Sequence, residues 1–255
     1  MDKTIRTPFQ GIKNVIRFNW HFYALALVFV FIALASTLLI SEAYSKYAYL
    51  IAGIIGITTS FSLLATYYIY DCSNVYSLDY LEELNITSKD KLVNIHSGFD
   101  EFSFTIAQKF NPQIFEVFDF YNREKHTEVS IERARKVSDV FPNTKTITTS
   151  TLPLATQSVN YIFVLFSAHE IRNTEERIVF FQEMEKILQQ NGKVIVVEHL
   201  RDFNNFMAYT IGFFHFFSKS EWKKTFNASY LSIQKETKIT PFVSVFILQK
   251  NGITS

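Results

Sequence analysis

The chain has 255 residues, a length that corresponds to one or two domains. Its aromatic content of 16% and its 27 phenylalanines are high for a soluble protein, and its mean hydropathy is slightly positive. The 25 basic and 24 acidic residues nearly cancel, so the composition gives no basis for nucleic-acid binding. Cys72 is the only cysteine, which excludes a disulfide within the chain.

The first 70 residues have the pattern of a membrane hairpin. Residues 1–21 are rich in basic side chains, and we expect this basic segment to lie on a membrane surface. Residues 22–40 and 47–70 carry no charged side chain, and each stretch is long enough to cross a bilayer. We therefore predict a transmembrane helical hairpin over residues 22–70. The alternative is a removable signal peptide followed by a buried helix, and the second apolar stretch argues against it.

The charges around this hairpin predict its orientation. Basic segments beside membrane spans stay in the cytoplasm, so the N-terminus should be cytoplasmic. Two spans return the chain to the side on which it started. We therefore expect an integral membrane protein in which residues 71–90 form an acidic linker and residues 91–255 form a cytoplasmic domain.

Short apolar strands alternate with helices from residue 91 onward, which is the pattern of an α/β fold. The strand–helix–strand unit over residues 161–197 requires parallel strands with a right-handed crossover. Asn191-Gly192 is expected to form the turn that ends its helix. The last two strands flank Thr240-Pro241 and predict an antiparallel hairpin that closes a mostly parallel sheet. The predicted strands cover residues 92–95, 114–118, 146–148, 161–166, 194–197, 231–238 and 242–249, and the predicted helices include 129–138, 174–189 and 220–228.

Polar side chains stand at the carboxyl ends of two of these strands. One strand is followed by His169 and Glu170, and the next by Glu198 and His199. Ligands bind at this edge of open α/β sheets, and neighbouring strands lie about 4.8 Å apart, so we expect these side chains to share one pocket. His169 and His199 are candidate general bases, and Glu170 is a candidate catalytic partner that orients the imidazole.

A metal ion is an alternative for the same region, because imidazoles and carboxylates together are ligands for Mn, Fe or Zn. No HxxxH or HExxH spacing supports such a site, so we assign no metal ligand from the sequence. The side chains that could contribute are His96, His169, Glu170, Glu198 and His199.

Two stretches carry a resemblance to a known family: LPLATQSVNYIFVLFSAHEI, residues 152–171, and LQQNGKVIVVEHL, residues 188–200. They resemble the second half of class I, type 11-like S-adenosylmethionine-dependent methyltransferases. In that family an LPF element precedes a strand and a helix, and an L-KPGG turn precedes the next strand. Pro153 matches the first element and Gly192 the end of the turn. The resemblance covers residues 92–250 and implies a Rossmann-like methyltransferase sheet with S-adenosyl-L-methionine as cofactor.

The resemblance also implies where that cofactor binds. The family has an acidic residue and a GxGxG loop at the first strand of the domain, whereas only Gly98 of that pattern remains here. Asp119 matches the carboxylate that holds the cofactor ribose. We therefore expect altered cofactor contacts, with the alternative that ordinary cofactor binding has been lost. The implied cofactor-binding residues are Asn94, His96, Ser97, Gly98, Asp119, Phe120, Leu152 and Phe166.

Residues 203–217 are almost entirely apolar and too short to span a membrane. One interpretation is a buried helix that packs on the sheet. The other is a cap or a shallow membrane contact over the active site, and the two interpretations can both hold, on different faces. Substrate contacts are expected from Arg201, Phe214 and His215, which lie in or beside this segment.

The resemblance and the predicted anchor together imply a function. We expect a membrane-anchored methyltransferase that acts on an apolar, membrane-resident small molecule, such as a lipid, a quinone or a phenol-like compound. Tethering would raise the local concentration of a substrate that is confined to the bilayer. The alternatives are a non-catalytic assembly protein that has repurposed the fold, and a metal-assisted enzyme. The oligomeric state is left open by the sequence.

Overall fold

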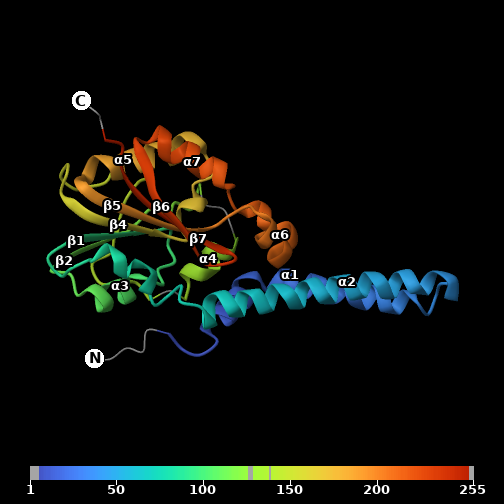
Figure 1. Cartoon of the computed structure of the whole chain (residues 1–255). Coiled ribbons are helices and arrows are strands. Elements are labelled where there is room, and N and C mark those ends of the chain that lie inside the picture. Colours follow the sequence, from blue (N-terminus) through green and yellow to red (C-terminus); the bar gives the residue numbers. More distant parts are fainter. Residues whose placement is uncertain (1–5, 126–128, 138, 253–255) are drawn as a thin grey trace.

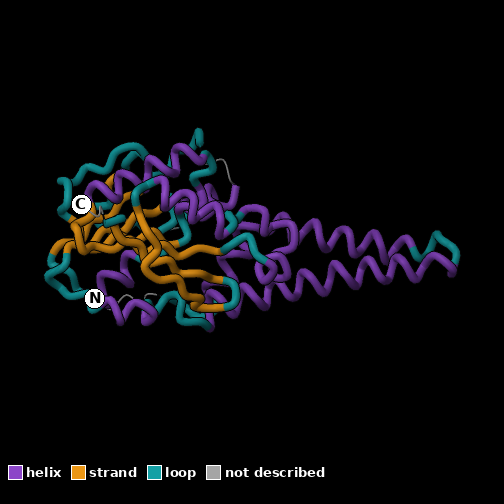
Figure 2. Tube along the Cα trace, turned by 45° about the horizontal axis from the view of Figure 1, so that its top comes forward, coloured by secondary structure: helices purple, strands orange, loops and turns teal. Residues whose placement is uncertain are grey.

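Two long helices project from an α/β domain in the computed structural model, which describes residues 6–125, 129–137 and 139–252 (Figure 1). The hairpin consists of α1 (Gln10–Ser36) and α2 (Glu42–Tyr67). A single π-helical turn, η1 (Tyr68–Cys72), leads from α2 into the domain. Both views show the hairpin extending away from the sheet (Figures 1 and 2).

The hairpin is apolar and mostly exposed. The two helical spans have mean hydropathies of 1.9 and 1.8, and only 6% and 17% of their most apolar stretches are buried. Length and composition are therefore sufficient for both helices to cross a membrane. Their large exposed apolar side chains include Leu27, Phe31, Leu38, Leu39 and Ile57.

The amino-terminal part of α1 packs on the domain. α1 continues past the predicted boundary at residue 21 but is kinked at Asn19, where the backbone angles are non-helical and the side-chain amide donates to the Val15 carbonyl. Phe18 is buried against Phe99, with ring centroids 5.3 Å apart. The basic segment is thus an extension of the first span and covers the domain with one of its faces.

Asp71 holds the start of α1. Its carboxylate accepts hydrogen bonds from the backbone N–H groups of Gly11 and Ile12, both at 2.8 Å. A Cβ atom at residue 11 would lie 2.3 Å from Tyr70 Cβ, so this close approach requires glycine. A carboxylate at a helix N-terminus is also favoured by the helix dipole. The contact fixes the two ends of the hairpin to each other at the domain surface.

Residues 71–90 are packed rather than extended as a linker. Val75, Leu78 and Leu81 are fully buried in the domain, and Asp79–Leu84 forms a short 3-10 helix. This packing joins the hairpin firmly to the sheet.

The sheet has seven strands in the order β3-β2-β1-β4-β5-β7-β6. β1 to β5 are parallel, and β7 is antiparallel to both of its neighbours. The predicted fold class is therefore confirmed, including the closing hairpin. The strands are β1 (Lys91–His96), β2 (Ile114–Asp119), β3 (Lys145–Thr146), β4 (Val159–Leu165), β5 (Leu188–His199), β6 (Leu231–Thr240) and β7 (Val243–Lys250).

Helices cover both faces of the sheet. α5 (Thr174–Ile187) and α7 (Lys219–Ala228) lie on one face with buried phenylalanines and Trp222, and α3 (Ser103–Phe110) lies on the other (Figures 1 and 2). α4 (Val129–Arg135) lies beside α1. These layers bury apolar side chains on both sides of the parallel strands, which explains their nearly continuous apolar sequences.

The Asn-Gly pair has a different role from the predicted turn. α5 ends at Ile187, and Asn191-Gly192 lies within β5. A Cβ atom at Gly192 would lie 2.9 Å from the Asn160 carbonyl oxygen. The glycine therefore permits close approach of β5 to β4 instead of ending the helix.

The apolar segment after β5 rests on the hairpin. It forms α6 (Phe203–Tyr209) and the 3-10 helix η4 (Thr210–His215), and α6 lies against α2 (Figure 1). Both interpretations hold in part, because Ala208 and Phe217 are buried, Phe217 in the core of the domain, whereas five large side chains are exposed beside an already apolar helix. These exposed side chains are Phe203, Phe206, Met207, Ile211 and Phe214.

Candidate functional site

A cavity of about 230 Å³ opens at the carboxyl ends of β1, β4 and β5. Its walls come from the loop after β1, from the segments that follow β4 and β5, and from the first turns of α1. Ligands bind at this edge in open α/β sheets, and here the hairpin closes one side of it. Residues that line the cavity include Asn14, Phe18, Tyr70, Tyr76, Ser97, Glu101, Phe166, His169, Glu170, His199 and His215.

Gly98 shapes the loop after β1. It has φ 87°, a left-handed conformation that favours glycine, and its N–H donates to His96 Nδ1 at 3.1 Å. A Cβ atom at this position would lie 2.1 Å from Arg135 Nη1, so the Arg135 side chain covers the glycine. The absence of a side chain at Gly98 is therefore what lets the Arg135 side chain lie directly against the loop backbone.

Asp119 stands at the end of β2, opposite His96 in the strand register. Its carboxylate accepts from Tyr121 N–H at 2.9 Å and from Arg135 Nη1 at 2.8 Å. Arg135 thus fills the space between Gly98 and Asp119, where the family resemblance places the ribose. The Arg135 side chain is 37% exposed, and an ion pair at such exposure contributes about 0–1 kcal/mol. The loop and the carboxylate therefore fit a ribose once Arg135 turns outward.

Four of the eight predicted cofactor-binding residues do not line the cavity and instead support the segments around it: Asn94, His96, Phe120 and Leu152. The Asn94 side-chain amide donates to Ser103 Oγ at 2.8 Å, and His96 accepts from the loop backbone. Phe120 and Leu152 are buried in the hydrophobic core. Among the described residues, the predicted cofactor contacts that line the cavity are Ser97 and Phe166.

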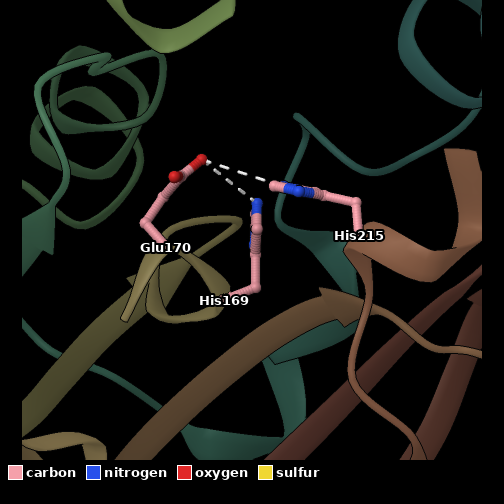
Figure 3. A group of neighbouring side chains, drawn as sticks. All are labelled: His169, Glu170 and His215. Atoms are coloured by element: carbon pink, nitrogen blue, oxygen red, sulfur yellow. Dashed lines mark ion pairs between the residues drawn. The ribbon is translucent and has the colours of Figure 1, made fainter. Parts of the chain in front are cut away.

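His169 is held between the carboxylates of Glu198 and Glu170, and Figure 3 shows its side chain beside that of Glu170. Its Nδ1 lies 2.7 Å from Glu198 Oε2, and its backbone N–H donates to Glu198 Oε1 at 3.2 Å. Its Nε2 lies 3.5 Å from Glu170 Oε1. Burial opposes charging of the ring, but the carboxylates of Glu198 and Glu170 outweigh it and raise the pKa of His169 to about 10. The ring is an imidazolium near neutral pH, which favours a hydrogen-bond donor over the predicted general base.

His215 joins this charged end of the cavity. Its Nε2 lies 4.0 Å from Glu170 Oε1, and its ring centroid lies 4.9 Å from that of His169 (Figure 3). Arg172 Nη1 donates to the carbonyl of His215 at 2.6 Å and to that of His169 at 3.2 Å. These bonds tie the turn after α6 to the turn after β4.

The other two predicted substrate contacts point elsewhere. Arg201 donates from Nε to the Phe216 carbonyl at 2.8 Å and from Nη2 to the Phe214 carbonyl at 3.2 Å. The Phe214 side chain is exposed on η4. Arg201 therefore holds the backbone that presents His215, and Phe214 belongs to the exposed apolar surface.

His199 lies in an aromatic environment. Its Nδ1 lies 3.0 Å from the Phe242 carbonyl, which can only accept, so Nδ1 carries the proton. Nε2 therefore accepts from the Tyr70 hydroxyl at 2.7 Å. Burial lowers the pKa of His199 to about 4, so the ring is neutral. His199 links β5 to η1 and positions Tyr70 at the cavity wall. Rings that surround it are Tyr70, Phe166, Tyr209 and Phe216.

A second polar cluster at the cavity was not predicted from the sequence. Glu101 accepts from Arg6 Nη1 at 2.9 Å, from the Tyr76 hydroxyl at 2.5 Å and from the Asn14 amide at 3.3 Å. The Arg6 guanidinium also lies 3.4 Å from the centroid of the Tyr76 ring. These residues lie far apart in the chain and follow no motif, so no local pattern could have identified them. They hold the N-terminal segment over the cavity.

Comparison with protein families and with curated proteins gives no match. Solved structures that are similar include a SAM-dependent methyltransferase from Aquifex aeolicus, with 12% identity, a TM-score of 0.52 and coverage of 76% of this chain and 98% of that chain. A second, from Clostridium acetobutylicum, has 11% identity, a TM-score of 0.52 and coverage of 83% and 100%. A Sulfolobus solfataricus protein described as a type 11 methyltransferase has 14% identity, a TM-score of 0.50 and coverage of 70% and 94%. At these identities the likeness concerns the fold. The domain that follows the hairpin has the Rossmann-like fold of S-adenosylmethionine-dependent methyltransferases, type 11 proteins among them.

Proposed function

We propose that this chain is a membrane-anchored, S-adenosylmethionine-dependent methyltransferase that acts on an apolar, membrane-resident small molecule. One observation carries the proposal: a single cavity at the ligand edge of a methyltransferase sheet is lined both by the loop after β1 and by the first turns of α1. An apolar acceptor in the bilayer and a cofactor in the domain could meet in such a cavity.

The cofactor would be held by Ser97, Gly98 and Asp119, which lie at the ends of β1 and β2. When bound, S-adenosylmethionine supplies an electrophilic methyl group on a positively charged sulfur. Gly98 lets the cofactor approach the loop backbone, and Asp119 can accept hydrogen bonds from two ribose hydroxyls. Phe166 offers an aromatic face, which attracts cations, at the cavity wall.

The acceptor would contact the charged end of the cavity. The His169 imidazolium can donate a hydrogen bond to an oxygen of the methyl acceptor, and the adjacent Glu170 carboxylate can accept a proton from that oxygen. His199 acts as a positioning residue, because it holds the Tyr70 hydroxyl at the cavity wall. Methyl transfer needs mainly in-line positioning, so these contacts would supply orientation and charge stabilisation.

The apolar hairpin supports membrane anchoring. α1 and α2 are long and apolar, and the exposed phenylalanines of α6 lie directly beside α2. An apolar surface of this extent is suited to contact with lipid acyl chains. We place both termini and the domain in the cytoplasm, because the basic segment precedes an even number of spans. A topology reporter fused after residue 255 should be active in the cytoplasm, and activity confined to the opposite side would overturn this orientation.

Cofactor binding is the direct test of the enzyme proposal. Isothermal titration of the full chain in detergent with S-adenosylmethionine and with S-adenosylhomocysteine should give saturable binding of one molecule per chain. A folded protein that binds neither compound would favour the second candidate, a non-catalytic assembly protein with a repurposed fold. One observation favours this second candidate. The Arg135 side chain lies over Gly98 and against Asp119, where the cofactor would bind.

A further inference from the structure

Three side chains at the charged end of the cavity form a compact group, which we name the His–Glu–His cluster: His169, Glu170 and His215. One ligand atom from each residue lies within 4.8 Å of the other two (Figure 3). Two imidazole nitrogens and one carboxylate oxygen are a ligand set that suits Mn, Fe and Zn. Two of the three residues are buried and the third is partly buried, so the cluster differs from the exposed acidic groups common on protein surfaces.

Glu198 supplies a second, independent observation. Histidines that bind metals almost always donate their other ring N–H to a carboxylate, a carbonyl or water, which fixes the tautomer and the ring orientation. His169 does so here, because its Nδ1 lies 2.7 Å from the fully buried Glu198 carboxylate. This bond leaves Nε2 directed toward Glu170. The arrangement is that of a metal ligand with its supporting carboxylate already in place.

The backbone of the cluster is also held in position. Arg172 donates to the carbonyls of both His169 and His215, so two segments from different parts of the chain are fixed side by side. Arg201 fixes the same 3-10 turn through the carbonyls of residues 214 and 216. Such support limits the movement needed to bring the three ligand atoms to one ion.

The three ligand atoms must move slightly closer together to bind one ion. His169 Nε2 and His215 Nε2 lie 3.5 and 4.0 Å from Glu170 Oε1. Ligand atoms at about 2.1 Å from a common ion lie roughly 3–3.5 Å apart, so closure within about an ångström is required. The His215 side chain is 28% exposed, so we expect it to make this adjustment, whereas His169 is fixed by Glu198.

We propose that the His–Glu–His cluster binds one divalent transition-metal ion of the Mn, Fe or Zn class, with its open coordination positions facing the cavity. All three ligands line that cavity, so an oxygen of a bound molecule could complete the coordination. Ion binding stands independently of the methyltransferase proposal. The role that follows from it, coordination of the acceptor oxygen in place of the hydrogen bond from His169, rests on that proposed function.

The proposed ligand set differs from the five possible metal ligands that were identified from the sequence. His199 is excluded because both of its ring nitrogens are engaged, with the Phe242 carbonyl and the Tyr70 hydroxyl. His96 accepts from Gly98 N–H in the cofactor loop and does not line the cavity. His215 takes their place, although it lies in an apolar segment and the sequence suggested a substrate contact.

The test uses the full chain in detergent after treatment with a chelator and its removal, at about pH 8. Metal ligands must be deprotonated, so the ion has to displace the proton that His169 carries in the metal-free protein. Co²⁺ titration followed by visible absorption, and Mn²⁺ titration followed by electron paramagnetic resonance, should each give one saturable site per chain. His215→Ala and Glu170→Gln should weaken binding at least 10-fold, a loss comparable with that caused by changes around known metal sites. His21→Ala, which removes an imidazole outside the cluster, should bind as the wild type does.

Two results would overturn the inference. The first is an absence of saturable Co²⁺ and Mn²⁺ binding by folded wild-type chain. The second is wild-type affinity in both His215→Ala and Glu170→Gln, which would assign the ions to adventitious surface sites. Melting curves in chelator establish that the variants are folded, and His215 is partly exposed, so its loss should leave the fold intact. Cofactor titration on the same samples separates the two proposals, since loss of cofactor binding with an intact metal site would refute only the methyltransferase function.

Discussion

The ends of β4 and β5 carry the same two residue types and differ completely in environment. Leu165 and Val197 are paired in the register; His169 and Glu170 follow β4, and Glu198 and His199 are the last two residues of β5. His169 lies between carboxylates and has its pKa raised to about 10. His199 lies among aromatic rings and has its pKa lowered to about 4.

The difference arises from the direction of one side chain. Glu198 precedes His199 in sequence, yet its carboxylate binds His169 in the 3-10 turn after the neighbouring strand. His199 is left with the Tyr70 hydroxyl and the Phe242 carbonyl, which are neutral partners. One strand end therefore delivers charge to the cavity, and the other fixes the hairpin to the sheet. Histidines at equivalent strand ends need not share a role.

Removal of the His169 ring should have the largest effect. His169→Ala should lower turnover roughly 10²–10³-fold with little change in cofactor affinity, because a preorganised donor at the acceptor end is lost. His169→Asn is the safer variant, because its amide can still donate to the buried Glu198 carboxylate. His199→Phe serves as the comparison and should retain most of its turnover per folded molecule. Equal losses of turnover in the two variants would abolish the distinction between the strand ends.

The two histidines should also give opposite pH dependences of stability in metal-free protein. The folded pKa of His199, about 4, lies below the ordinary value of 6.5, so its contribution is full above pH 6.5 and is lost as the pH falls toward 4. The folded pKa of His169, about 10, lies above 6.5, so its contribution is full below pH 6.5 and is lost as the pH rises toward 10.

Melting temperatures measured across this pH range check the prediction. His199→Phe should remove the acid-side loss and His169→Asn the alkaline-side loss. Identical pH profiles for the wild type and both variants would show that the opposite environments do not persist in solution.

The end of β2 also carries a carboxylate, that of Asp119, which we expect to bind the cofactor. Asp119→Ala should weaken S-adenosylmethionine binding about 10- to 100-fold, since each charge-assisted hydrogen bond contributes about 1.5–3 kcal/mol and part of this is offset by the lost Arg135 ion pair. The melting temperature should change little. Calorimetric titration provides the measurement, and unchanged affinity would place the ribose elsewhere.

Arg135 provides the smallest and most discriminating change. Arg135→Ala should strengthen cofactor binding by up to about 5-fold, because an ion pair that contributes about 0–1 kcal/mol no longer has to be broken. Arg135→Lys keeps the charge and is the matched control. Weaker binding in Arg135→Ala would mean that Arg135 holds the cofactor instead of competing with it.

Local patterns were sufficient for the fold. Apolar strands such as 161–166 and 194–197, helices between them and a closing hairpin follow from periodicities within a few residues, and the structure has each of these elements. The largest difference is at β5, which begins at Leu188, inside the predicted helix 174–189. The edge at which His169, Glu170 and His199 meet also follows from strand direction. The sequence therefore determined the sheet, the apolar hairpin and the place of the cavity.

Only the tertiary structure decided what those residues do. The Tyr70–His199 bond joins positions 129 apart, and the bond from Gly11 to Asp71 joins positions 60 apart. No periodicity connects such positions, so the covering of the cavity by α1 and the neutral state of His199 were not predictable. The charge on a buried histidine depends on which carboxylates and rings enclose it, and long-range packing sets these. For the same reason, His215 joined His169 and Glu170, although the sequence places it in an apolar segment.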